Sequence, residues 1–152
     1  INRFLKVLNT KDEIIPEISD EDFYNSIGII TPFSNQEALL KQKIIETFGS
    51  VEDESNKQKE PIIKVGTVHK YQGSERETII FSSVYNKEKI GKTPNLFFNR
   101  EDPDMINVAV TRAKEIFILF GNKEVLNDEN TYSGIMVKHI EKFQKEKIIN
   151  LT

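Results

Sequence analysis

The chain has 152 residues, enough for one compact domain with a hydrophobic core but short for two. Its 21 basic and 24 acidic side chains give a net charge of −3, which disfavours a module that binds nucleic acid through overall charge. Cysteine is absent, His69 and His139 lie far apart, and no apolar run reaches the ~20 residues of a membrane helix. We therefore expect no disulfide, no metal site and no membrane partner, and a cytoplasmic location because no signal-peptide pattern is present.

The first strongly patterned region predicts a strand followed by a helix. Residues 27–30 are apolar and mostly β-branched, which favours a buried strand. Ser34 and Glu37 form a capping-box pattern at the start of a helix that Gly49 ends. Leu40 falls on the apolar face of this helix.

The middle of the chain predicts two further strands joined by polar segments. Residues 50–61 are polar and charged, and we interpret them as an exposed connection. Strands are predicted over 62–68 and 78–84. A long loop is predicted over 85–101, which is rich in Lys and Asn and contains Gly91 and Pro94.

The last third predicts helix, strand and helix. Asp102 and Pro103 suit the cap and first position of a helix that runs past Val110. Residues 116–120 are apolar without alternation, as expected of a central parallel strand, and a packing helix is predicted over 131–147. The alternation of strands and helices predicts an α/β fold, with a mainly parallel sheet flanked by helices in a single domain.

Two segments near strand ends carry side chains that can bind phosphate and sugar groups. Residues 31–36 follow the first strand, although a simple strand-to-helix turn explains this segment better when it is taken alone. The segment 65–75 places many functional groups around Gly73, where glycine lets a backbone approach a ligand closely. Thr67 and His69 can donate to phosphate oxygens, the contacts that position a nucleic-acid backbone.

A third segment, 107–114, contains an arginine in an apolar context immediately before a strand. A guanidinium on such a rigid element can act as an arginine finger that offsets negative charge on a transferring phosphoryl group. The alternative is that Arg112 pairs with an acidic residue at the rim of the core.

In this order, the three segments resemble the second RecA-like domain of superfamily 1 helicases. The resemblance is greatest to the 5′-to-3′ branch that includes the RNA helicase of nonsense-mediated decay. Residues 27–33 with Gln36 resemble motif IV, 67–75 resemble motif V, and 107–113 resemble motif VI. The resemblance covers residues 27–122 and implies a three-layer RecA-like (P-loop NTPase-like) fold.

The resemblance also implies roles for individual residues of an ATP-dependent helicase. Arg112 matches the catalytic arginine that reaches the γ-phosphate across a cleft between two motor domains. Nucleotide contacts are implied for Gln72, Gly73 and Glu75. Contacts to single-stranded DNA or RNA are implied for Thr67, His69, Pro32, Phe33 and Thr111. ATP and Mg²⁺ would be held mainly by the first RecA-like domain of the same protein.

The sequence contains no convincing phosphate-binding loop of its own. Gly91-Lys92-Thr93 resembles part of one, but Asn86 occupies the position of the first glycine and Pro94 follows. Because the chain also begins at Ile1, we expect a fragment (residues 1–152) of a longer protein that is inactive alone. Two alternatives are a self-sufficient nucleotide hydrolase that uses Gly91-Lys92-Thr93 and a degenerate helicase-like module that binds without hydrolysis.

Overall fold

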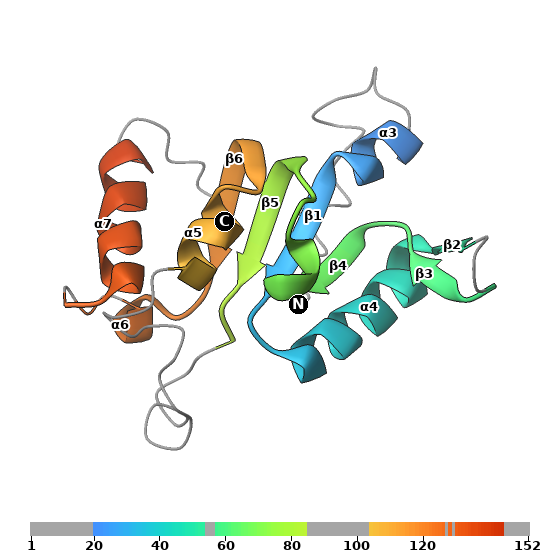
Figure 1. The fold of residues 1–152 in the computed structure, drawn as a ribbon, viewed down its shortest axis with the longest axis horizontal. Helices are drawn as coiled ribbons and strands as arrows, with labels where there is room; N and C mark the ends of the chain where they lie inside the picture. Colours follow the sequence, from blue (N-terminus) through green and yellow to red (C-terminus); the bar gives the residue numbers. More distant parts are fainter. Residues whose placement is uncertain (1–19, 54–56, 85–103, 127, 129, 145–152) are drawn as a thin grey trace.

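The computed structural model describes residues 20–53, 57–84, 104–126, 128 and 130–144 (Figure 1). The elements are, in chain order, α3 (Asp20–Asn25), β1 (Ile27–Thr31), α4 (Ser34–Phe48), β2 (Ser50–Glu52), β3 (Lys59–Pro61), β4 (Lys64–Thr67), the 3₁₀ helix η1 (His69–Tyr71), β5 (Arg76–Ser82), α5 (Asp104–Val110), β6 (Ala113–Phe120), α6 (Lys123–Leu126) and α7 (Tyr132–Gln144). None of the helices within these ranges is both long and apolar enough to cross a membrane.

The main sheet has four parallel strands in the order β4-β1-β5-β6. Thr31 pairs with Thr67, so β1 and β4 finish together at the carboxyl end of the sheet. Arg76 pairs with Ala113, so β5 and β6 start together at the amino end. Because all four strands run the same way, the two ends lie a full strand length apart.

Apolar side chains cover both faces of this sheet. Ile30, Ile79 and Phe81 pack on one face against α5, α6, α7 and η1. Ile29 and Ile80 pack on the other face against α3 and α4. Each such side chain contributes ~1.5–3 kcal/mol when it is fully buried. The predicted α/β fold, a mainly parallel sheet between two layers of helices, is confirmed (Figure 1).

The predicted capping box at the start of α4 is wrong. The cap position is Phe33, which has an extended backbone and makes no side-chain capping bond. Ser34 is the first helical residue, and the Glu37 amide donates to the Phe33 carbonyl at 2.9 Å. The Glu37 carboxylate instead accepts two hydrogen bonds from Lys70 Nζ, at 2.9 and 3.0 Å. A buried carboxylate gains more from a counter-charge than from an exposed backbone amide, which explains the outcome.

The strand predicted at 116–120 forms, but it is not central. In the part of the chain that the structure describes, β6 is the last strand of the sheet and pairs with β5. Ile116 is 53% exposed. The apolar run arises because Phe117 and Leu119 pack against one core cluster and Ile118 and Phe120 against the other.

Other element boundaries differ from the predictions. The exposed connection at 50–61 contains a two-stranded antiparallel hairpin, β2–β3, and the strand predicted over 62–68 is the shorter β4. The helix expected to carry Arg112 ends at Val110, which leaves Arg112 in the turn before β6. The predictions at 85–101, Asp102-Pro103 and Gly91-Lys92-Thr93 lie outside the described residues.

Candidate functional site

The residues predicted to bind ligands gather at both ends of the sheet. At the carboxyl end, Thr31 and Thr67 finish neighbouring strands, and both are buried. The Thr31 hydroxyl has no hydrogen-bond partner within the described ranges. Pro32 and Phe33 follow Thr31, and Phe33 packs partly against the core. His69 lies two residues beyond Thr67 on η1 and is exposed, so four of the predicted nucleic-acid contacts lie at this end.

The sequence implied that the segment resembling motif V forms a single turn at one strand end. The structure shows a longer connection. It leaves β4 at Thr67, at the carboxyl end, and enters β5 at Arg76, at the amino end. Its middle is anchored by Tyr71, which is completely buried. The Tyr71 hydroxyl donates to the Lys64 carbonyl at 3.0 Å. Burial raises the pKa of this hydroxyl, so it remains a neutral donor at physiological pH.

Two glycines in the sheet make room for Tyr71. A Cβ on Gly28 would lie 2.4 Å from the Tyr71 hydroxyl, and one on Gly66 would lie 3.0 Å from its ring. Both glycines therefore serve a close approach between a side chain and the sheet, a common reason for glycine within a strand.

The amino end of the sheet collects the residues predicted to contact nucleotide. Gln72, Gly73 and Glu75 are exposed, and Gly73 adopts a φ of +77° that favours glycine. The amide of Arg76, the residue after Glu75, donates to the Arg112 carbonyl at 3.0 Å. This bond joins the Gly73 turn to the turn that carries Arg112.

The Arg112 side chain is half-buried and has no acidic partner in the described part of the chain. Its Nη2 donates to the Thr111 hydroxyl at 3.2 Å, and its Nε is buried without a hydrogen-bond partner there. The pairing with an acidic rim residue, which the sequence left open, is not seen among the described residues. The structure also places Thr111 beside Arg112, at the opposite end of the sheet from Thr67.

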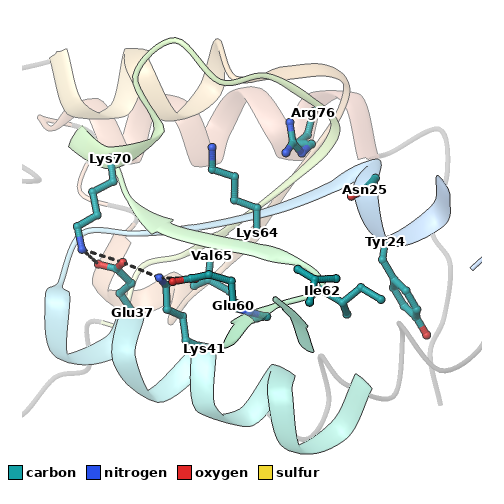
Figure 2. A pocket seen from close by; sticks show the side chains of 12 residues that line it. Tyr24, Asn25, Glu37, Lys41, Glu60, Ile62, Lys64, Val65, Lys70 and Arg76 are labelled. Atoms are coloured by element: carbon teal, nitrogen blue, oxygen red, sulfur yellow. Dashed lines mark hydrogen bonds and ion pairs between the residues drawn. The ribbon is translucent and has the colours of Figure 1, made fainter. Parts of the chain in front are cut away.

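A groove of about 430 Å³ runs along β4 between α4, β3 and η1 (Figure 2). Lys70 and Lys41 converge on two carboxylates at one end: Lys70 pairs with Glu37, and Lys41 pairs with Glu60 at 2.9 Å. Lys64 also lines the groove, and its ammonium donates to the Ser74 hydroxyl at 2.8 Å.

Sequence patterns did not single out these lysines. The pair between Lys70 and Glu37 joins residues 33 positions apart, beyond the reach of any local pattern. Within the described ranges no group of acidic and imidazole side chains is arranged to hold a metal ion.

Fold and site together define a parallel, three-layer α/β domain with candidate ligand-binding residues at both ends of its sheet. Residues 4–124 match the family model described as an AAA domain, and the chain belongs to that family. It is a C-terminal domain of a superfamily 1 helicase, from the branch that resembles the helicase of nonsense-mediated decay.

Curated relatives agree with this assignment. The chain is 31% identical to Helicase sen1 of Schizosaccharomyces pombe over 86% of its own length and 7% of that protein. It is 32% identical to the Regulator of nonsense transcripts 1 homolog of Arabidopsis thaliana, over 77% of its own length and 8% of that protein. It is also 32% identical to the DNA replication ATP-dependent helicase/nuclease JHS1 of Arabidopsis thaliana, over 75% of its own length and 8% of that protein. The chain thus spans less than a tenth of each of these relatives.

Proposed function

We propose that the chain is the second motor domain of an ATP-dependent helicase, in which Arg112 completes the nucleotide site. The observation that carries this proposal is the junction at the amino end of the sheet. There the exposed turn at Gly73 and Glu75 is hydrogen-bonded, through Arg76, to the turn that holds Arg112. A guanidinium without an acidic partner in the described chain, beside a glycine turn, suits a site that receives phosphate.

In this proposal ATP and Mg²⁺ are held mainly by the first RecA-like domain of the same protein. Gln72, Gly73 and Glu75 contact the nucleotide from this side. As the bond between the β- and γ-phosphates breaks and water adds to the γ-phosphoryl group, Arg112 stabilises the charge on its oxygens. ADP and phosphate then leave, and the two domains separate.

Single-stranded DNA or RNA would bind at the carboxyl end of the sheet. His69 is exposed and can donate to phosphate oxygens, while Thr67, Pro32 and Phe33 line the same end. Thr111 lies at the other end, so we propose that its hydroxyl orients Arg112 and does not touch nucleic acid. Because the two sites lie at opposite ends of the sheet, the domain could hold single-stranded nucleic acid while it binds nucleotide.

Replacing the proposed finger in the full-length protein tests this function. We expect Arg112→Ala to lower the kcat for ATP hydrolysis by about 10³-fold or more, the usual effect of losing an arginine finger. The Kd for nucleotide should change only a few-fold, because the first domain supplies most of the binding. Stopped-flow binding of a fluorescent ATP analogue and a phosphate-release assay measure the two quantities.

Lys114→Ala is the matched control, because Lys114 is an exposed cation two residues away that pairs with Glu77 at 3.1 Å. Its kcat should stay within about twofold, since exposed pairs contribute little. Wild-type kcat in the Arg112→Ala protein would overturn the assignment of the finger.

A further inference from the structure

Lys64 connects the amino end of β4 to the turn that faces the proposed nucleotide site. Its ammonium donates to the Ser74 hydroxyl at 2.8 Å and lies 5.1 Å from the centre of the Tyr71 ring. The Tyr71 hydroxyl in turn donates to the backbone carbonyl of Lys64. These contacts close a small loop of interactions around Gly73.

The turn at Gly73 has few other restraints from outside its own segment. Within it, the Gln72 amide donates to the His69 carbonyl and the Ser74 amide to the Tyr71 carbonyl. Among the described residues, the bond from Lys64 is the one side-chain hydrogen bond that ties this turn to a preceding strand. An exposed turn held by so few contacts samples many conformations unless such a bond restricts it.

The lysine also sits in an environment that restricts its own movement. Partial burial and the nearby Arg76 charge lower the pKa of Lys64. The Lys64 ammonium lies near the Tyr71 ring and donates to the Ser74 hydroxyl at the same time. Two contacts therefore restrict this exposed side chain, and both are made by the segment that it positions.

We infer that Lys64 is a positioning residue for the nucleotide site, which acts by holding the Gly73–Glu75 turn through Ser74. This inference rests on the proposed function, because it assumes that the turn contacts nucleotide. Lys64 itself does not need to touch ATP. Its loss should therefore weaken nucleotide binding more than the chemical step.

The experiment uses full-length protein that carries Lys64→Met or Ser74→Ala, each of which removes one partner of the bond. We expect either variant to raise the KM for ATP about three- to tenfold, as losing one exposed hydrogen bond to a charged group should. The kcat should stay within about twofold. Lys64→Arg keeps a cationic donor and should return the KM toward the wild-type value.

A double mutant separates this mechanism from a general loss of structure. If the two residues act through their bond, Lys64→Met with Ser74→Ala should raise the KM no more than Lys64→Met alone. Lys43→Met removes a lysine that pairs with Glu46 on the exposed side of α4, and it should leave the KM unchanged. Fully additive effects, or an unchanged KM in both single variants, would overturn the inference.

The outcome is distinguishable from failure of the proposed function. If Arg112→Ala abolishes turnover while Lys64→Met and Ser74→Ala leave the KM at its wild-type value, the positioning role alone is wrong. If Arg112→Ala retains turnover, the proposed nucleotide site is wrong whatever the lysine variants do.

Discussion

Tyr71 packs closely over two glycines of the sheet, in the middle of the segment that resembles motif V. The ring crosses the sheet where Gly28 and Gly66 lack side chains, and the hydroxyl reaches the Lys64 carbonyl. A residue in the middle of the segment that resembles motif V is thus a packing residue, and it fixes the positions of the functional residues on either side.

A methyl group at Gly28 should therefore destabilise the domain. Its Cβ would lie 2.4 Å from the Tyr71 hydroxyl and 2.8 Å from Ile79. We expect Gly28→Ala to lower the free energy of unfolding by about 1–3 kcal/mol, the usual cost of overpacking. Urea denaturation followed by circular dichroism measures it. Adding Tyr71→Phe removes the clashing oxygen, so the double variant should lose less stability than the sum of the two changes. A wild-type midpoint for Gly28→Ala would contradict this packing.

Individual residues differed in how far sequence could place them. The resemblance implied nucleotide contacts for Arg112, Gly73 and Glu75, and a backbone hydrogen bond through Arg76 joins the two turns that carry them. Lys64 was not predicted, because its partner Ser74 lies ten residues away across a chain reversal and neither residue stands out by type. Chemistry that depends on a local motif is visible in sequence, whereas support from distant side chains is not.

Among the elements, α4 shows how a buried charge overrides a local pattern. Glu37 is 4% exposed and receives Lys70 Nζ at 2.9 Å, with Lys41 3.9 Å away. The local pattern assigned Glu37 to the helix cap, but tertiary pairing determined its contacts.

Removing the partner from this carboxylate should cost stability. We expect Lys70→Met to lower the free energy of unfolding by about 1–2 kcal/mol at neutral pH, because a buried charge keeps only the more distant Lys41. The expected loss of stability is modest because the Lys70 side chain is 64% exposed. Thermal melting measures the change, with Lys43→Met as the matched control, since its exposed pair with Glu46 should contribute little to stability. Equal melting temperatures for the two variants would show that Glu37 does not depend on Lys70.

The order and type of the main elements were predictable, because strands and helices differ in the spacing of apolar residues. The β2–β3 hairpin was missed, since its strands have three residues each and β2 is fully exposed, which leaves no buried face to read. The prediction that β6 is a central strand was also wrong. An apolar run indicates that both faces of a strand are covered, but it does not indicate how many strands pair with it.

On the scale of the whole molecule, the proposed function assigns nucleotide to one end of the sheet and nucleic acid to the other, and no group of His, Asp or Glu side chains in the described residues is arranged to hold a metal ion. We expect the isolated chain of 152 residues to show no Mg²⁺-dependent ATP hydrolysis above background, because the proposed mechanism requires the first motor domain. A phosphate-release assay at micromolar protein checks this expectation. Turnover that scales with the concentration of the isolated chain would refute it and favour a self-sufficient hydrolase.

The strand order also governs when the domain can fold during synthesis. β1 leaves the ribosome first among the strands of the sheet, yet both of its neighbours, β4 and β5, come later in the chain. At ~5–20 residues per second, the interval between the ends of β1 and β5 lasts several seconds. Until Thr67 has emerged the apolar residues of β1 have no strand partner, and until Ser82 has emerged one edge of β1 stays unpaired. A nascent chain of this domain therefore depends on α4 or on chaperones to cover β1 during that time.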